Sequence, residues 1–194
     1  MKILLLGHGR CGSTSLHYGL SDIMNHKMVI EPFNRGLWKS YYKTNPPFKK
    51  GDSNGQNVIF KTLVGPNFQN EWIDENYRQF DKTIILMRGN FRETVISHQN
   101  AFKYGYINQY EPTEKITKPS LSHVIENYKW LLNFYSRTVT THLIWYEDIY
   151  TEDSIGSKDV IRLLDLGLSE QQLDKLYDKY LNPKFRLRKK LTQI

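Results

Sequence analysis

The strongest chemical signal in the sequence is the segment of residues 7–14, which reads GHGRCGST. It follows a short apolar run and opens a helical pattern. Backbone N–H groups at such a turn form an anion site together with the helix N-terminus. Gly7 and Gly12 have the glycine spacing of a P-loop, and Thr14 falls on its Ser/Thr position. Ser13 stands where an NTPase has its lysine, and Arg10 supplies a cation earlier, so the pattern predicts an anion site without NTPase activity.

A second candidate anion site begins at Arg88, directly after another apolar run. In open parallel sheets, ligands bind beyond the carboxyl ends of the strands. Arg88 is therefore expected at the same edge as the glycine segment. Ser97 follows on a predicted helix and can add a hydroxyl, and a planar guanidinium with a hydroxyl suits a phosphate monoester.

The elements that must position these residues alternate between short apolar runs and longer segments with helical spacing. This alternation predicts one α/β domain over residues 1–194, with three α/β/α layers around a mainly parallel sheet of about five strands. Two polar excursions, at about 31–56 and 105–119, are expected to form acceptor or lid segments. The predicted strands are 2–6, 28–30, 58–61, 83–87 and 142–146, and the predicted helices are 13–25, 70–80, 92–104, 121–137, 160–166 and 169–181.

Together the two anion segments resemble the cofactor sites of sulfotransferases that use 3′-phosphoadenosine 5′-phosphosulfate (PAPS). Members of that family bind the 5′-phosphosulfate with a strand–loop–helix motif such as G-x-x-R-S-G-S-T, and residues 9–14 are similar, with Cys11 in place of a serine. A second family motif, R-x-P-x-x-x-x-x-S, binds the 3′-phosphate, and Arg88 to Ser97 is one residue longer. Residues 145–148 (WYED) resemble the Y-E-D-L strand end of the family, and residues 160–168 resemble its late helix.

The resemblance implies the P-loop sulfotransferase fold, PAPS as cofactor, its product adenosine 3′,5′-bisphosphate (PAP), and no metal. It implies a short member of the family with a small-molecule or glycan acceptor. The residues that carry over to cofactor binding are Gly9, Arg10, Cys11, Gly12, Ser13, Thr14, Arg88 and Ser97.

A sulfuryl transfer also needs a base that takes the proton of the acceptor hydroxyl. Cytosolic members use the His of a K-T-H run, but the matching residues 61–63 read KTL here. The carbohydrate branch uses a glutamate after the second strand, in E-P-F or E-P-L, and residues 31–33 read EPF. The resemblance therefore implies Glu31 as the base, with Arg10 on the sulfuryl oxygens and Lys61 adding positive charge beside them. It favours a carbohydrate or another alcohol as acceptor over a phenol.

Composition leaves two other functions open. The chain has 27 Lys and Arg against 20 Asp and Glu, a net charge of +7. The hypothesis of a nucleic-acid-binding module is supported only by this charge and by the aromatic residues, and no nucleic-acid recognition motif matches. A P-loop nucleotide-binding protein or small-molecule kinase is the nearer alternative. The basic tail at 184–190 supplies five positive charges and leaves 22 basic and 20 acidic residues elsewhere, so nucleic acid is not expected as a partner.

The single cysteine, Cys11, excludes an intramolecular disulfide and favours a reducing, cytoplasmic setting. No apolar run is long enough to span a bilayer, and the first run is too short for a signal peptide. An electropositive loop would lower the pKa of the Cys11 thiol. Catalysis by a thiolate would need a base partner, and none is evident, so Cys11 is interpreted as a packing position.

Overall fold

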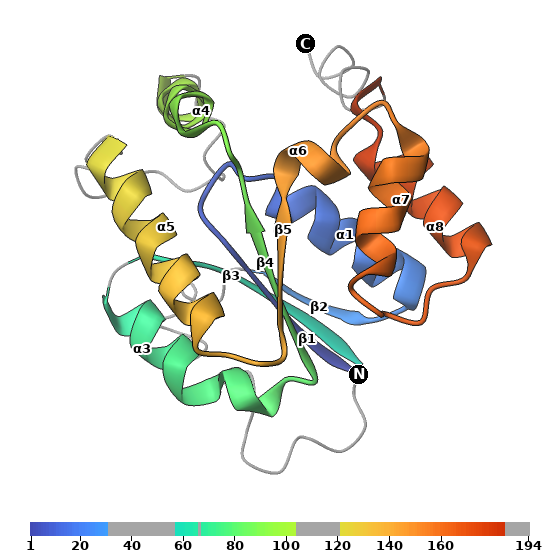
Figure 1. The fold of residues 1–194 in the computed structure, drawn as a ribbon, viewed down its shortest axis with the longest axis horizontal. Coiled ribbons are helices and arrows are strands. Elements are labelled where there is room, and N and C mark those ends of the chain that lie inside the picture. Colours follow the sequence, from blue (N-terminus) through green and yellow to red (C-terminus); the bar gives the residue numbers. More distant parts are fainter. Residues whose placement is uncertain (31–56, 66, 104–120, 185–194) are drawn as a thin grey trace.

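The computed structural model describes residues 1–30, 57–65, 67–103 and 121–184. Its centre is a five-stranded sheet in which all pairs are parallel, with the order β2-β3-β1-β4-β5 (Figure 1). The first strand in the sequence is thus the middle strand of the sheet. The strands are β1 (Lys2–Gly7), β2 (Lys27–Ile30), β3 (Val58–Leu63), β4 (Lys82–Met87) and β5 (Thr141–Trp145).

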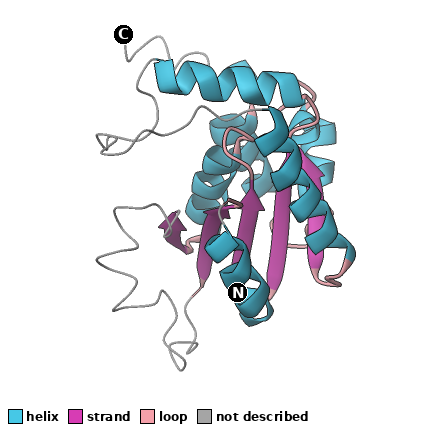
Figure 2. Ribbon diagram, turned by 90° about the vertical axis from the view of Figure 1, so that its left-hand side faces the viewer, coloured by secondary structure: helices cyan, strands magenta, loops and turns pink. Residues whose placement is uncertain are grey.

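Helices cover both faces of the sheet, which gives the three-layer α/β/α architecture predicted from the sequence (Figures 1 and 2). One face is covered by α1, α7 and α8, and the other by α3 and α5. The helices are α1 (Ser13–Met24), α3 (Asn67–Asn76), α4 (Phe91–Lys103), α5 (Leu121–Ser136), α6 (Tyr146–Ile149), α7 (Ser154–Arg162) and α8 (Glu170–Leu176). A 3₁₀ turn at Tyr77–Gln79 follows α3, and a π-helical turn at Tyr177–Leu181 follows α8.

The continuous apolar run of β1 has a direct structural reason. Ile3 and Leu5 belong to the core beneath α1, whereas Leu4 and Leu6 belong to the core beneath α5. All four side chains are fully buried. Because alternate residues of a strand point to opposite faces, a strand covered on both faces needs apolar residues at every position. This double burial fixes the end of β1, from which the glycine segment starts.

The predicted fold class and all five predicted strands are confirmed, but some helix limits were wrong. The helix predicted at 160–166 is α7, which begins at Ser154 with the Asp153 side chain as its N-cap. Residues 163–166 are not helical, and Asp165 has a left-handed backbone with φ of 48°. The helix predicted at 70–80 begins at Asn67 and ends at Asn76.

A further difference lies at the end of β5. Tyr146, predicted to end the last strand, instead begins the short helix α6. On α5, Val124, Tyr128 and Leu131 are buried, whereas Leu132 and Tyr135 are exposed. No helix in the described part of the chain is long and apolar enough to cross a membrane. The excursions at 31–56 and 105–119 and the end of the basic tail, 185–194, lie outside the described residues.

Candidate anion-binding site at the carboxyl edge of the sheet

The glycine segment forms a tight loop between β1 and α1. The backbone N–H of Cys11 donates to the carbonyl oxygen of His8 at 3.3 Å. Arg10 and Gly12 both have left-handed backbones, with φ of 71° and 86°. Gly12 is the N-cap of α1, so the N–H groups of the first helical turn follow it directly. The loop therefore has the backbone arrangement that an anion site requires.

The short helix α6 packs against this loop. The hydroxyl of Tyr150 donates to the carbonyl oxygen of Gly12 at 2.7 Å. A Cβ atom at Gly12 would lie 2.7 Å from the Tyr150 ring and 2.9 Å from the Tyr146 ring. Gly12 is thus required twice, once for its positive φ and once for the close approach of two aromatic rings.

Cys11 is fully buried behind the loop. A Cβ atom at Gly7 would lie 2.7 Å from the Cys11 sulfur, so the first glycine of the segment makes room for the thiol. Burial raises the pKa of the Cys11 thiol, and hydrogen bonds with Ser13 and the charge of Lys61 offset this only in part. The expected lowering of the pKa was therefore wrong, and packing, the interpretation preferred from the sequence, fits the buried thiol.

Lys61 brings a buried positive charge to the loop from β3. Its side chain is 1% exposed, and Nζ donates to the hydroxyl of Thr14 at 2.8 Å. Leu5 of β1 pairs with Lys61 in the sheet, and Ile30 of β2 pairs with it on the other side. A buried ammonium is expensive unless polar or anionic groups surround it. Its position beside the first turn of α1 therefore suits an anion.

Arg10 links the loop to α4. Its Nε donates to the hydroxyl of Ser97 at 3.1 Å, across 87 positions of sequence. Ser97, predicted as a partner of Arg88 on a 3′-phosphate, is thus held by the loop arginine here. This contact brings the two predicted anion segments together at one edge of the sheet.

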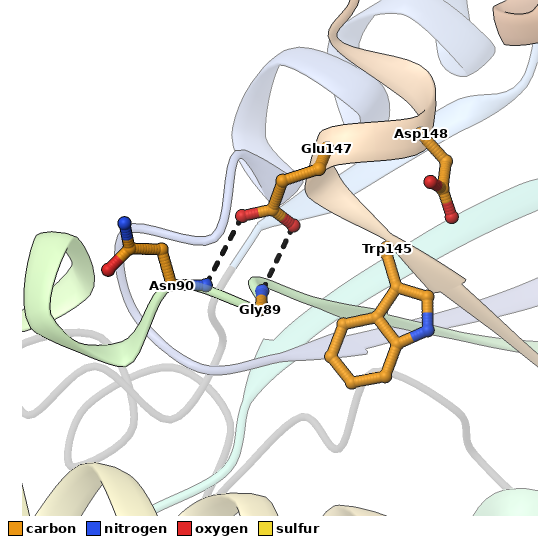
Figure 3. A pocket seen from close by; sticks show the side chains of 5 residues that line it. All are labelled: Gly89, Asn90, Trp145, Glu147 and Asp148. Carbon is orange, nitrogen blue, oxygen red and sulfur yellow. Dashed lines mark hydrogen bonds between the residues drawn. The ribbon is translucent and has the colours of Figure 1, made fainter.

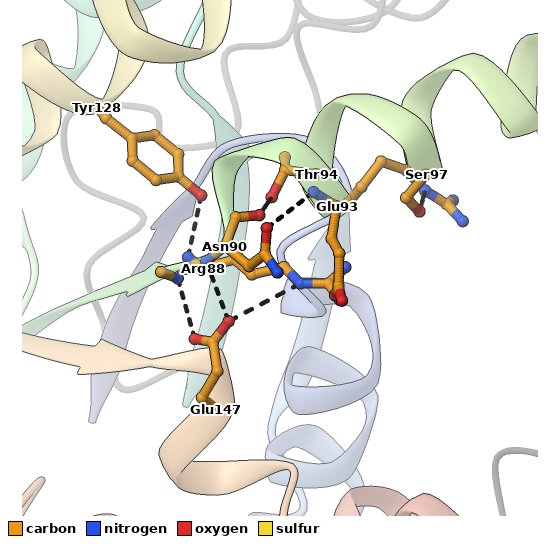
Figure 4. A network of polar contacts seen from close by, with 9 residues as sticks. Arg88, Asn90, Glu93, Thr94, Ser97, Tyr128 and Glu147 are labelled. Atoms are coloured by element: carbon orange, nitrogen blue, oxygen red, sulfur yellow. Dashed lines mark hydrogen bonds and ion pairs between the residues drawn. The ribbon is translucent and has the colours of Figure 1, made fainter. Parts of the chain in front are cut away.

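Arg88 lies among acidic and aromatic side chains (Figure 4). Its guanidinium forms an ion pair with Glu93 and lies 3.9 Å from a carboxylate oxygen of Glu147. It also stacks over the ring of Tyr146, with 4.6 Å between the guanidinium carbon and the ring centroid. The side chain is only 16% exposed, so these groups cover most of the cation.

Glu147 holds the segment between β4 and α4 by hydrogen bonds to its backbone. Its two carboxylate oxygens accept hydrogen bonds from the backbone N–H of Gly89, at 3.0 Å, and of Asn90, at 3.3 Å (Figure 3). The Asn90 side chain in turn accepts from the N–H of Glu93. A pocket of about 380 Å³ opens beside this segment, lined by Gly89, Asn90, Trp145, Glu147 and Asp148.

Helix α5 contributes a polar cluster that was not predicted from the sequence. The Tyr128 hydroxyl accepts from the backbone N–H of Arg88 at 3.0 Å, and burial raises the pKa of Tyr128 to about 12. The Asn127 amide lies 3.1 Å from Nδ1 of His8 and 3.2 Å from Nε2 of His123. An Asn on the buried face of a helix was the one signal of this cluster in the sequence, since buried polar side chains need partners.

The structure brings together most of the residues predicted for the site. Gly9 and Ser13 are buried within the loop segment, Thr14 is exposed, and Arg10, Lys61, Arg88 and Ser97 reach the same edge. Glu31 lies outside the described residues. Within the described ranges, no three His, Cys, Asp or Glu side chains gather as a metal site. The acidic partners of Arg88, and the tyrosines at the start and at the C-cap of α6, were not predicted as site residues.

Several solved structures resemble this fold, among them the following two. A mouse sulfotransferase crystallised with PAP matches with a TM-score of 0.59 and 13% identity, over 92% of this chain and 63% of the other. The present chain thus spans less than two thirds of that protein. A shikimate kinase from Bacteroides thetaiotaomicron matches with a TM-score of 0.50 and 14% identity, over 86% of this chain and 97% of the other. No family model and no curated protein matches the sequence. At these identities the likeness shows the fold alone, the three-layer α/β/α arrangement described above.

The close packing at Gly12 predicts a specific loss of stability. We expect Gly12→Ala to lower the free energy of unfolding by ~2–4 kcal/mol, because alanine adds backbone strain and two ring contacts. Gly167→Ala is the matched control, since Gly167 has φ of 68° but no atom within 4 Å of the point where a Cβ would lie. Its free energy of unfolding should fall only by the cost of the backbone strain, ~1–2 kcal/mol. Urea unfolding measures both, and equal losses would contradict the packing of α6 on the loop.

The buried thiol predicts how the protein responds to pH. The folded pKa of Cys11 is raised, so above the pKa of an unfolded thiol the unfolded chain loses a proton that the folded chain keeps. The free energy of unfolding should therefore fall as the pH rises above about 8.5. Cys11→Ser should flatten this dependence in the alkaline range. Iodoacetamide should label the native protein far more slowly than the urea-unfolded chain, and equal rates would contradict the burial.

Proposed function

We propose that this chain is a PAPS-dependent sulfotransferase that transfers the sulfuryl group to a hydroxyl of an acceptor, with a carbohydrate or another alcohol favoured. The observation that carries the proposal is the contact between Lys61 and Thr14. In a P-loop NTPase, the hydroxyl at the position of Thr14 binds Mg²⁺. Here an ammonium donates to that hydroxyl at 2.8 Å, which suits a metal-free anion better than a magnesium nucleotide.

The arrangement of the cations also fits a nucleotide with two separate anionic groups. The loop with Arg10 and Lys61 would hold the 5′-phosphosulfate. Arg88, at the end of the neighbouring strand β4, would hold the 3′-phosphate. The hydrogen bond between Arg10 and Ser97 keeps these two regions adjacent. PAPS has this pair of groups, whereas adenosine triphosphate has all its phosphates in one chain.

The proposed reaction needs two tasks from the protein, stabilisation of negative charge and removal of a proton. The acceptor oxygen forms a bond to sulfur while the bond from sulfur to the 5′-phosphate oxygen breaks, and PAP leaves. Arg10 and Lys61 stabilise the negative charge on the sulfuryl and bridging oxygens. Glu31 takes the proton of the acceptor hydroxyl. It follows Ile30 in the sequence, and Ile30 pairs with Lys61 in the sheet.

A small-molecule kinase is the second candidate, because the shikimate kinase likeness covers nearly all of that protein. Ser13 in place of the P-loop lysine argues against it, since that lysine reaches the β- and γ-phosphates. Calorimetry with PAP and with magnesium ATP separates the two. We expect tighter binding of PAP, unchanged by chelation of Mg²⁺. Tighter ATP binding, or affinity that is lost without Mg²⁺, would contradict the sulfotransferase proposal.

Arg88→Ala tests the assignment of the 3′-phosphate. The affinity of the variant for PAP should fall by ~10²-fold, because a charge-assisted contact is lost. Its affinity for adenosine 5′-phosphosulfate should fall by much less. Calorimetric dissociation constants for both ligands give the answer. If the affinities for both ligands fall equally, Arg88 does not bind the 3′-phosphate.

Glu31→Gln tests the base. The variant should keep its affinity for PAP and lose ~10²–10⁴-fold in turnover, the usual contribution of general base catalysis. The measurement is radiolabelled sulfate transfer from PAPS to an acceptor found by screening glycans and small alcohols. Retained turnover would remove Glu31 from the mechanism.

A further inference from the structure

We propose that Glu93 sets the selectivity of the site for 3′-phosphorylated nucleotides, because its carboxylate is the internal partner that a 3′-phosphate must displace from Arg88. The proposal rests on the function proposed above and concerns the same site. It starts from the ion pair between Arg88 and Glu93 at the first turn of α4 (Figure 4).

Arg88 has little room for an additional partner. Glu93 pairs with its guanidinium, Glu147 lies at 3.9 Å, and the ring of Tyr146 covers one face. A phosphate that binds this guanidinium must therefore replace one of the two carboxylates. The structure distinguishes between them.

Glu147 is the carboxylate that stays. Both of its oxygens accept backbone N–H groups, from Gly89 and Asn90, just before α4 begins. Moving Glu147 away would break two charge-assisted hydrogen bonds to the backbone, in addition to its contact with Arg88.

Glu93 is the carboxylate that moves. Its side chain is 54% exposed, and exposed ion pairs contribute little to stability. Its backbone N–H is held separately by the Asn90 side chain at 3.0 Å, so the carboxylate can swing away while α4 keeps its start. The exchange of Glu93 for phosphate on Arg88 thus needs only a side-chain rotation.

The exchange has a consequence for affinity. After it, the Glu93 carboxylate remains attached close to the phosphate, and two negative groups at short range repel each other. Glu93 therefore weakens the contribution of the 3′-phosphate specifically. A neutral residue at position 93 should strengthen it.

Calorimetry with adenosine 5′-monophosphate and PAP isolates this contribution, because the two ligands differ only in the 3′-phosphate. The measured quantity is the ratio of their dissociation constants. Glu93→Gln should raise the preference for PAP by about tenfold, through the PAP affinity alone. Glu93→Ala should act in the same direction. Glu75→Gln, an equal charge change at an exposed position of α3, should leave the ratio unchanged. In the Arg88→Ala background, Glu93→Gln should raise the preference for PAP by much less.

The possible failures can be told apart. If the wild-type chain does not prefer PAP over adenosine 5′-monophosphate, the proposed function fails and this inference fails with it. If the wild-type chain prefers PAP and the ratio is unchanged or lower in both Glu93 variants, only the role of Glu93 is wrong. If Glu75→Gln raises the ratio as much as Glu93→Gln, the effect is one of net charge, which also contradicts the proposal. Unfolding midpoints near that of the wild type show that the variants are folded.

Discussion

The site depends on the packing of one short helix, α6, against two loops that are distant in the sequence. The rings of Tyr146 and Tyr150 pack against Gly12 of the glycine loop, and the Tyr150 hydroxyl also donates to the carbonyl oxygen of Gly12. Glu147, between the two tyrosines, holds the N–H groups of Gly89 and Asn90. Three side chains within five residues thus fix both candidate anion-binding segments, so the fold itself sets the distance between the two segments.

The second constraint is the balance of charge at the carboxyl edge of the sheet. Lys61 contacts a hydroxyl, Arg10 contacts Ser97, and Arg88 contacts carboxylates. These partners differ in how readily they yield to an anion. Hydroxyls can share a cation with an incoming phosphosulfate, whereas a carboxylate competes with it. Under the proposed function, the loop would bind an anion strongly, and Arg88 would exchange one of its carboxylate partners for a phosphate.

The sheet could be predicted because β1 and β4 are buried on both faces, which gives each a continuous apolar run in the sequence. The loop could be predicted because its glycines have positions fixed by backbone geometry. Helix α6 could not, because four residues are too few to show a helical period. The pairing of Arg88 with Glu93 and Glu147 depends on where α4 and α6 meet, and no spacing in the sequence encodes that. The unexpected end of α7 is followed by a left-handed turn at Asp165, a conformation that residues other than glycine adopt infrequently.

The most direct test is a crystal structure of the protein with PAP. We expect the 5′-phosphate on the backbone N–H groups of the loop and beside Arg10 and Lys61, the 3′-phosphate on Arg88, and the Glu93 carboxylate turned away. Glu147 should keep its two backbone hydrogen bonds. A nucleotide bound elsewhere on the protein, or a 3′-phosphate that does not contact Arg88, would contradict the central claim that this edge of the sheet is built for a nucleotide with two separate anionic groups.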